Sequence, residues 1–266
     1  MRIALSQLTT GPDPEKNLLL VEEWTRRAAD AGARVVVFPE ATMARFGTPL
    51  APLAEPLDGP WADGVRRIAA ATGTVVVAGM FTPATGGRVA NTLIATGAGV
   101  EAAYDKIHLY DAFGFRESDT VAAGSAPTVI DVDGVRLGLA TCYDIRFPEL
   151  FRAHADAGAV ATLLGASWGA GPGKAEQWDL LARGRALDAT VWLAAVDQAD
   201  PGTDAGPGSA PTGIGHSRVV GPDGTVRHAL GAGPELLVAD LDVDEVAAVR
   251  QRISVLANRR PEVWGR

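Results

Sequence analysis

Three side chains that could react with a substrate stand at or just past the ends of short apolar runs. Glu40 follows the run Val35–Phe38 and a proline, Lys106 follows a glycine-turn hairpin, and Cys142 ends the run Val135–Thr141. An open α/β sheet normally gathers its ligand-binding groups at strand ends. A thiol, a carboxylate and an ammonium group supply a nucleophile, a base and a cation, which suit covalent acyl transfer.

Each of these residues also has an ordinary structural interpretation: a packed core thiol, a turn or cap glutamate, and a solvated surface lysine. Their occurrence at three successive strand ends favours the catalytic interpretation. Cys142 is the only cysteine of the chain, which excludes an intramolecular disulfide and a cysteine-rich metal site. Because the sequence has no Cys/His cluster, no Walker string and no Gly-x-Gly-x-x-Gly after a strand, we expect neither a metal nor another cofactor.

The elements that must position these residues alternate along the chain. Strands are predicted for the short, mostly β-branched apolar runs, which are Arg2–Leu8, Arg34–Phe38, Val75–Met80, Asn91–Thr96, Val135–Thr141, Val160–Leu164, Val191–Val196, His216–Val220 and Leu236–Leu241. Most are continuous and not alternating, as in strands buried on both faces. Helices are predicted for Asp13–Ala31, Trp61–Thr72, Phe147–Ala157 and Ala175–Ala189. The chain is therefore expected to adopt an α/β fold.

The two halves of the chain have the same order of elements. Each half contains strand, helix, strand, helix and strand, followed by a hairpin whose turn is Gly97–Gly99 in the first half and Gly221–Gly224 in the second. Such halves suit a pseudo-twofold sandwich with two sheets face to face and helices outside. The segment Asp200–Gly215 is expected to be a long surface loop. Since no linker divides the halves, residues 1–266 are predicted to form a single domain.

Composition indicates a globular protein that acts on small molecules. Of 266 residues, 47% are hydrophobic and 21% are charged, and the formal net charge is −8. The acidic balance and the lack of a long Lys/Arg run argue against nucleic acid or a membrane surface as a partner. The N-terminus turns polar before a secretory apolar region could form, and no stretch approaches about 18 uninterrupted apolar residues. A cytoplasmic location is the expectation.

Several strings, spread over the chain, resemble those of one known family. They are Val37–Glu40, Asp105–Asp111, Gly138–Leu150 (GLATCYDIRFPEL), Ala166–Trp168, Gly215–Ser217 and Gly221–Gly224. With them the sequence resembles the nitrilase, or carbon–nitrogen hydrolase, superfamily and within it the Nit-type ω-amidase and deaminated glutathione amidase branch. The resemblance implies a four-layer αββα sandwich and a Glu-Lys-Cys triad at Glu40, Lys106 and Cys142. It also implies an additional active-site glutamate, which maps to Glu117.

The residue types suggest how such a triad would work. Cys142 would attack the amide carbonyl and form a thioester, while Glu40 would take the thiol proton and later activate water. Lys106, with the backbone N–H of Tyr143, would stabilise the oxyanion. His108 lies two residues past Lys106 and could be a second base, but we favour a structural role that holds the lysine loop. His154 and His228 are expected at the surface, and His216 at a strand end or in a loop.

Three residues are candidates for substrate binding. Arg146 could bind a substrate carboxylate bidentately, or it could form an ion pair with Glu149 or Asp144. Trp168 could line the pocket or pack in the core. Tyr143 could belong to the pocket wall or position the nucleophile turn.

The resemblance implies a hydrolase for small carboxylate-bearing ω-amides that releases ammonia. The alternatives are an N-carbamoyl or ureido-acid amidohydrolase, a nitrilase, which the sequence around Cys142 disfavours, and a non-catalytic binding protein on the same fold. The family commonly forms dimers, and the C-terminal segment Ile253–Arg266 could cross to a partner subunit or pack on its own. A homodimer is the expectation.

Overall fold

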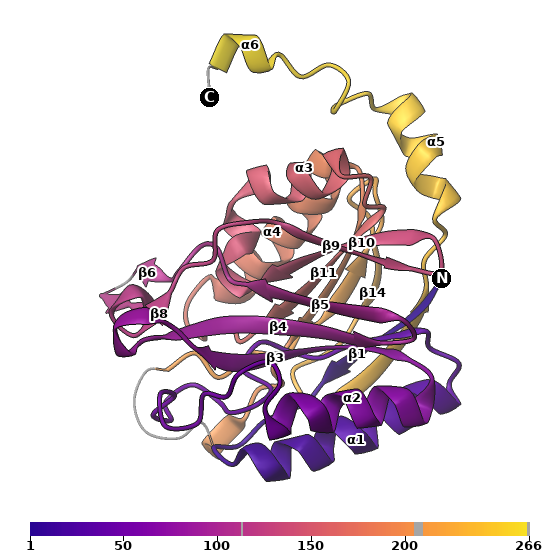
Figure 1. The fold of residues 1–266 in the computed structure, drawn as a ribbon. Helices are drawn as coiled ribbons and strands as arrows, with labels where there is room; N and C mark the ends of the chain where they lie inside the picture. The colour runs from indigo at the N-terminus through magenta and orange to yellow at the C-terminus, as the bar shows by residue number, and fades with distance from the viewer. Residues whose placement is uncertain (113, 205–209, 265–266) are drawn as a thin grey trace.

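Two mixed β-sheets lie face to face at the centre of the protein (Figure 1). The computed structural model describes residues 1–112, 114–204 and 210–264. The first sheet has the order β15 (Glu235–Asp240), β1 (Arg2–Gln7), β2 (Val35–Val37), β3 (Val75–Pro83), β4 (Val89–Gly97) and β5 (Val100–Asp105), and β8 (Val121–Ala122) pairs with β4. β1, β2 and β3 are parallel to one another. β15 runs antiparallel to β1, β4 runs antiparallel to β3, and β5 runs antiparallel to β4.

The second sheet repeats this arrangement. Its order is β14 (Val226–Ala229), β13 (Arg218–Val220), β12 (Trp192–Asp197), β11 (Ala161–Ala166), β10 (Val135–Thr141) and β9 (Thr128–Val132). β10, β11 and β12 are parallel, and the flanking strands β9, β13 and β14 are antiparallel. Both sheets thus have three parallel strands inside antiparallel edges, which is the predicted pseudo-twofold symmetry. A short hairpin of β6 (Asp111–Ala112) and β7 (Phe115–Arg116) stands apart.

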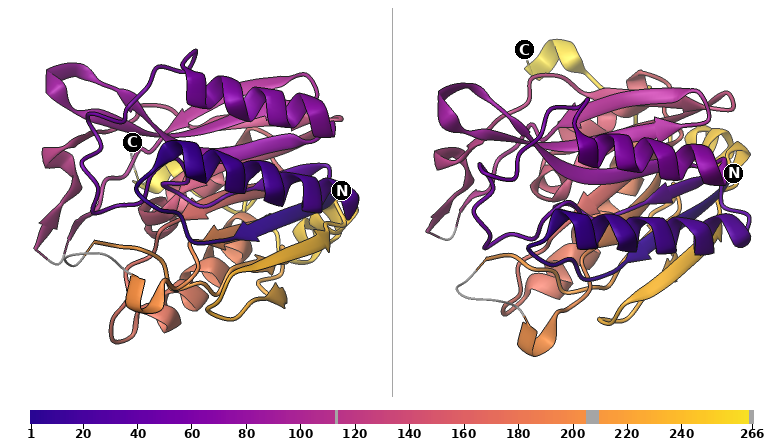
Figure 2. Two further views of the ribbon diagram at one scale, coloured as in Figure 1. Left: turned by 90° about the horizontal axis from the view of Figure 1, so that it is seen from below. Right: turned by 60° about the horizontal axis from the view of Figure 1, so that its bottom comes forward.

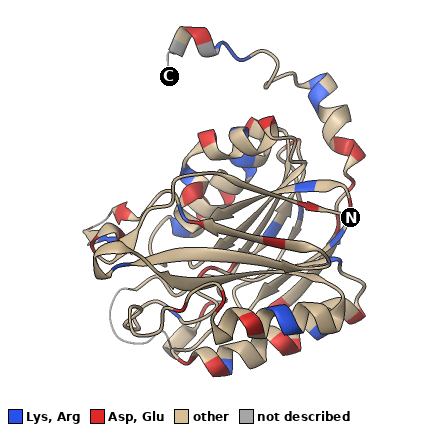
Figure 3. Ribbon diagram, viewed as in Figure 1, with Lys and Arg blue, Asp and Glu red and all other residues tan. Residues whose placement is uncertain are grey.

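Helices form the two outer layers. α1 (Pro14–Asp30) and α2 (Pro60–Thr72) cover the first sheet, and α3 (Pro148–Asp156) and α4 (Lys174–Ala189) cover the second (Figures 1 and 2). The resulting layers, helix, sheet, sheet and helix, confirm the predicted αββα sandwich. Acidic and basic residues are interspersed along α1 and α2, as the ribbon of Figure 3 shows. Among the described residues, none of the helices combines the length and the apolar character that a membrane crossing needs.

Burial on both faces explains why the strands read as continuous apolar runs. In β2, Val35 and Val37 belong to the core between the two sheets, whereas Val36 packs in the core under α1 and α2. Because successive strand residues point to opposite faces, each residue of such a strand is covered by one of these two cores. α1 begins where expected, since the Asp13 side chain accepts hydrogen bonds from the backbone N–H groups of Glu15 and Lys16.

Some elements differ from the sequence predictions. β13 begins at Arg218 and not at His216, and β9 and α5 (Asp244–Arg252) were not predicted. The predicted surface loop Asp200–Gly215 contains a short 3-10 helix at Gly202–Asp204, and residues 205–209 lie outside the described part of the chain. The surface prediction is wrong for the end of this segment, because Gly213 is buried and donates a backbone hydrogen bond to the carbonyl of Trp168.

The surface prediction for His154 is also wrong. This residue lies on α3, is fully buried, and places Nδ1 3.2 Å from the hydroxyl of Thr162 on β11. Burial lowers the pKa of His154 to about 4, so the ring is neutral at pH 7. His228 is exposed, as predicted.

The C-terminal segment leaves the sandwich after β15. α5 and the short α6 (Pro261–Trp264) extend beyond the body of the protein in Figure 1. Between them Leu256 packs against the main core, and the guanidinium of Arg259 forms an ion pair with Asp156 at the end of α3. These residues therefore contact their own subunit, and the homodimer stays a prediction.

Candidate active site

Two glycines from opposite sheets leave room for the backbone around Glu40. The segment Pro39–Ala41 leaves β2 and passes between Gly79 of β3 and Gly165 of β11. A Cβ at Gly79 would lie 2.7 Å from the backbone nitrogen of Ala41, and one at Gly165 would lie 2.9 Å from the backbone oxygen of Phe38. Both distances are too short, so only glycine lets this backbone pass between the sheets.

The carboxylate of Glu40 is fully buried and accepts hydrogen bonds at both oxygens. Oε1 accepts from the Lys106 Nζ at 2.9 Å and from the Asn91 amide at 2.7 Å, and Oε2 accepts from the Ser167 backbone N–H at 3.0 Å. All three partners are donors, which favours the ionised form of Glu40 in this arrangement.

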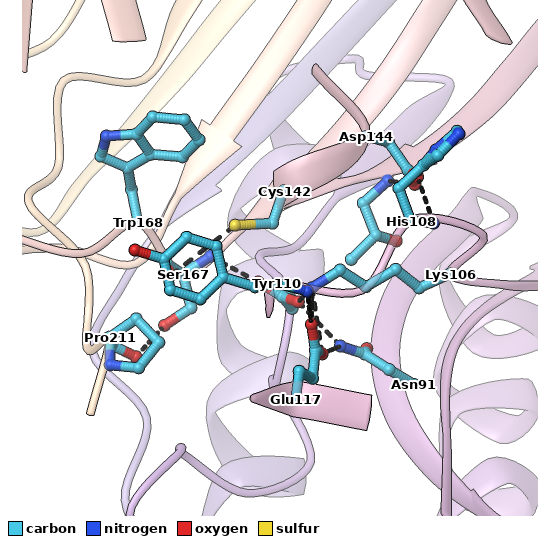
Figure 4. Close-up of polar contacts among 12 residues, drawn as sticks. Asn91, Lys106, His108, Tyr110, Glu117, Cys142, Asp144, Ser167, Trp168 and Pro211 are labelled. Atoms are coloured by element: carbon cyan, nitrogen blue, oxygen red, sulfur yellow. Dashed lines mark hydrogen bonds and ion pairs between the residues drawn. The ribbon is translucent and has the colours of Figure 1, made fainter. Parts of the chain in front are cut away.

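The ammonium group of Lys106 contacts two carboxylates, those of Glu40 and Glu117, and Figure 4 shows it next to Glu117. It follows the end of β5, and its side chain is 2% exposed. Besides contacting Glu40, Nζ donates to Glu117 Oε1 at 3.0 Å and to Oε2 at 2.8 Å. Glu117 begins the 3-10 helix Glu117–Asp119 and also accepts from the backbone N–H of Tyr110 at 2.6 Å. Glu117 thus fixes the position of the ammonium group together with Glu40.

The charges of this cluster depend on one another. Burial raises the pKa of Glu40, and the positive charge of Lys106 opposes that rise only in part. Burial also disfavours the ammonium form of Lys106, but the carboxylates of Glu40 and Glu117 outweigh it, and the pKa of Lys106 is raised well above its usual value. Lys106 is therefore a permanent cation and Glu40 a base of increased strength.

Cys142 stands on a tight turn between β10 and the 3-10 helix Cys142–Arg146. Its φ is 43°, in the left-handed region that residues other than glycine seldom adopt, and such strain is common at functional sites. The side chain is 8% exposed, and Sγ lies 3.8 Å from the carbonyl oxygen of Ser167. Burial and the negative charge of Glu40 raise the pKa of the thiol well above its usual value. The thiol is therefore protonated at neutral pH and needs a base to react.

One buried carboxylate joins the turn of Cys142 to the loop of Lys106. Asp144 Oδ2 accepts from the Tyr104 hydroxyl at 2.6 Å and from the Thr141 backbone N–H at 2.9 Å. Its Oδ1 lies 3.0 Å from the backbone nitrogen of His108 and 2.7 Å from the Nδ1 of His108. His108 thus holds the loop, as favoured from the sequence, and it contacts Asp144 and not Cys142.

Cys142, Lys106, Glu40 and Glu117 line one cavity of about 40 Å³, and Tyr143, Arg146 and Trp168 line it as well. The guanidinium of Arg146 lies 5.2 Å from the Trp168 ring and 5.7 Å from the Tyr143 ring. It donates a hydrogen bond of 2.7 Å to the Gln177 amide oxygen. The structure therefore brings all seven candidate residues to one site.

The ion pair considered for Arg146 is absent from the described part of the chain. Neither Glu149 nor Asp144 pairs with it, because the oxygens of Asp144 are taken by Tyr104, Thr141 and His108. Trp168 fulfils both roles considered for it, since it lines the cavity and also packs against Trp178 at 5.2 Å between ring centroids.

Asp197 and Asn91 were missed from the sequence. Asp197, at the end of β12, is fully buried and accepts backbone N–H bonds of 2.8 Å from Trp168 and from Ile214, so it ties Trp168, which lines the cavity, to the segment of Ile214. Burial raises the pKa of Asp197 well above its usual value. The signal was available, because Asp197 follows an apolar strand as Glu40 does. Asn91, on β4, contacts Glu40 and Glu117 and had no comparable signal.

In the part of the chain that the structure describes, no three His, Cys, Asp or Glu side chains are grouped so that they could hold a metal ion. The chemistry that the residues themselves offer is a thiol, a buried base and a fixed cation on one cavity, which is an arrangement for acyl transfer.

Residues 2–251 match the Carbon-nitrogen hydrolase family. The chain belongs to this family. It is 59% identical over 267 residues to Hydrolase Rv0480c of Mycobacterium tuberculosis, covering 97% of this chain and 95% of that protein. It is 35% identical over 266 residues to the deaminated glutathione amidase of Escherichia coli O157:H7, covering 98% of this chain and 97% of that protein.

A solved structure of the amidase from Nesterenkonia sp. AN1, which shows acrylamide added to its active-site cysteine, superposes with a TM-score of 0.81. The identity is 29%, with 99% of this chain and 98% of that chain covered. These similarities confirm the resemblance seen in the sequence to the nitrilase superfamily and its Nit-type branch. The protein is therefore an enzyme, a carbon–nitrogen hydrolase with amidases among its relatives.

Proposed function

We propose that this carbon–nitrogen hydrolase cleaves the amide of small ω-amides that carry a carboxylate, through a thioester on Cys142. Glu40 takes the thiol proton as Sγ attacks the amide carbon, and the proton passes to the departing nitrogen as the C–N bond breaks. Ammonia leaves, and the acyl group remains on Sγ. Water then gives a proton to Glu40 and attacks the thioester, which releases the acid and restores the thiol.

Lys106 and Glu117 support this sequence without taking part in bond formation. Since Lys106 keeps its charge throughout, it stabilises the oxyanion that develops on the carbonyl oxygen, together with the backbone N–H of Tyr143. Glu117 binds Nζ through both oxygens and so fixes the direction of the ammonium group.

The position and the hydrogen-bond partner of Arg146 support a substrate that carries a carboxylate. Its guanidinium lies on the wall of the cavity that contains Cys142, and it has a neutral amide, that of Gln177, as its hydrogen-bond partner. A guanidinium without an acidic partner can bind a substrate carboxylate bidentately. The aromatic rings of Tyr143 and Trp168 flank it and suit the short aliphatic chain of such a substrate.

The test is ammonia release from matched amides by the wild type and by Arg146→Ala. Glutaramate carries the carboxylate, and butyramide has a similar chain without it. We expect Arg146→Ala to lose roughly 30- to 1000-fold in kcat/KM for glutaramate and little for butyramide. An equal loss for both amides, or a wild type that does not prefer glutaramate, would refute the proposal. Faster turnover of an N-carbamoyl amino acid would favour the carbamoyl alternative.

A further inference from the structure

Arg146 has no acidic partner among the residues that the structure describes. Its half-buried side chain donates a hydrogen bond of 2.7 Å to the side-chain oxygen of Gln177, which is a neutral amide. The rings of Tyr143 and Trp168, at 5.7 and 5.2 Å from the guanidinium, are neutral as well. Guanidinium groups that lose part of their water are commonly paired with carboxylates, which offset that loss. The positive charge of Arg146 therefore stays uncompensated beside the cavity that it lines.

Gln177 reaches Arg146 from the first turn of α4, and contacts on both sides of Gln177 fix this turn. The backbone N–H of Gln177 donates to the carbonyl of Gly173 at 3.0 Å, and the next residue, Trp178, is fully buried. Lys174, three residues before Gln177, lines the cavity, and its carbonyl accepts the indole N–H of Trp168 at 3.0 Å. The amide of Gln177 is therefore presented to Arg146 by an anchored helix.

The carboxylates of the cavity are bound elsewhere. Glu40 and Glu117 both line it, and both form their ion pair with Lys106, at 2.9 and 2.8 Å. Lys174 brings a further basic group to the lining, and burial together with the positive charge of Arg146 lowers the pKa of Lys174. The carboxylate that Arg146 lacks therefore has to come from a bound molecule.

The neutral charge of Gln177 is what distinguishes it from a glutamate, because the two side chains have nearly the same size and shape. Gln177→Glu would keep an acceptor oxygen next to the guanidinium of Arg146. The resulting charge-assisted hydrogen bond would be stronger than the present one, so it would hold Arg146 at least as firmly. It would also cancel the charge of Arg146. A glutamine at this position therefore fixes the guanidinium without neutralising it.

We infer that Gln177 determines the specificity of the enzyme for anionic acyl chains, because its neutral amide orients Arg146 and leaves the positive charge of Arg146 to the substrate. This inference rests on the proposed function, since it needs Arg146 to bind the substrate carboxylate. Gln177 does not line the cavity and acts through Arg146, so it is a positioning residue. The charge at position 177 thus sets how strongly the enzyme prefers an acid to a neutral amide.

The test compares two substitutions of Gln177 by the ratio of kcat/KM for glutaramate to kcat/KM for butyramide. Gln177→Glu should lower this ratio about 10- to 100-fold, mainly through the KM for glutaramate. Gln177→Met keeps the length of the side chain but removes the acceptor, so Arg146 keeps its charge and loses only its orientation. It should lower the ratio by less than about fivefold. Gln251→Glu, the same chemical change at an exposed position of α5, is the control and should match the wild type.

The order of the two variants decides between charge and mere support. If Gln177 only held Arg146 in place, Gln177→Glu would keep the wild-type ratio and Gln177→Met would lose more, and that order would overturn the inference. A ratio for Gln177→Glu equal to that of Gln251→Glu would overturn it as well. Either result, with a wild type that prefers glutaramate and loses this preference in Arg146→Ala, would leave the proposed function standing. A wild type without the preference would refute both. Thermal melting of each variant confirms that it is folded.

Discussion

Asp144→Asn tests whether one buried carboxylate positions the nucleophile relative to the cation. The substitution keeps the size of the side chain but turns one acceptor oxygen into an NH₂ donor. Tyr104 can rotate its hydroxyl and His108 can change tautomer, but the backbone N–H groups of Thr141 and His108 cannot adapt. Whichever way the amide is oriented, either the buried N–H of Thr141 or the partly buried N–H of His108 faces another donor.

The structure gives the size of the effect. A buried N–H that loses a charged acceptor costs about 1.5–3 kcal/mol, and a chain of this length loses roughly 2–4 °C in Tm for each kcal/mol. We therefore expect Tm to fall by about 3–12 °C. Because the turn of Cys142 and the loop of Lys106 share Asp144, we also expect kcat to fall by about 10- to 100-fold with a smaller change in KM.

The assay combines thermal melting with steady-state ammonia release from glutaramate, well below the melting range of the variant. The matched control is Asp131→Asn, since Asp131 also accepts a backbone N–H, that of Gly134, but at a surface turn. The control should keep the kcat of the wild type. An Asp144→Asn protein that melts earlier yet keeps the wild-type kcat would refute the positioning role, and unchanged melting would refute the energetic argument.

Three further substitutions test single links of the account. Lys106→Met should lower kcat for glutaramate by about 100- to 1000-fold, because it removes the cation at the oxyanion, and a variant with near wild-type kcat would contradict that role. Glu40→Gln should remove the acid limb of the kcat/KM–pH profile. In the wild type, the acid limb should lie above the pKa of an ordinary glutamate, because the pKa of Glu40 is raised. The base form of Glu40 is lost as the pH falls through this raised pKa. An acid limb that survives the substitution would belong to another group. His154 is neutral in the folded state down to about pH 4, whereas in the unfolded chain it takes up a proton near pH 6.5. The free energy of unfolding should therefore fall as the pH decreases from 6.5 to about 4, by at most about 3 kcal/mol. His154→Gln should flatten that slope in urea unfolding, and an unchanged slope would contradict it.

The sequence predicted the layers of the fold well because the strands of both sheets are covered on both faces. A run such as Val35–Phe38 is apolar throughout, so it indicates a strand that is buried on both faces. The N-cap at Asp13 marks the start of α1. Two-residue strands such as β6 and β8 could not be predicted, since two residues carry no periodicity. His154 was misplaced because histidine usually lies near the surface, and only the packing of α3 on the second sheet buries it.

The site residues that directly follow strands could be predicted from the sequence. The site residues that depend on contacts between distant segments could not. Glu40 and Cys142 each follow an apolar run, so their positions could be found in the sequence. The hydrogen bonds of Asp144 with Tyr104 and His108, and that of Arg146 with Gln177, join segments that are distant in the chain. The need for glycine at positions 79 and 165 could not be predicted, because it arises only when the two sheets bring Gly79 and Gly165 against the same backbone segment.

The most direct test of the central claim is the mass of the intact protein, rapidly quenched in acid during turnover of glutaramate. The account predicts a species heavier by one acyl group, with peptide mapping that places the acyl group on Cys142 in the wild type. Cys142→Ala should form no such species and should lose activity by several orders of magnitude while it keeps its Tm. An acyl group on any other residue, or a Cys142→Ala protein that retains more than about 1% of the wild-type rate, would contradict the thioester mechanism.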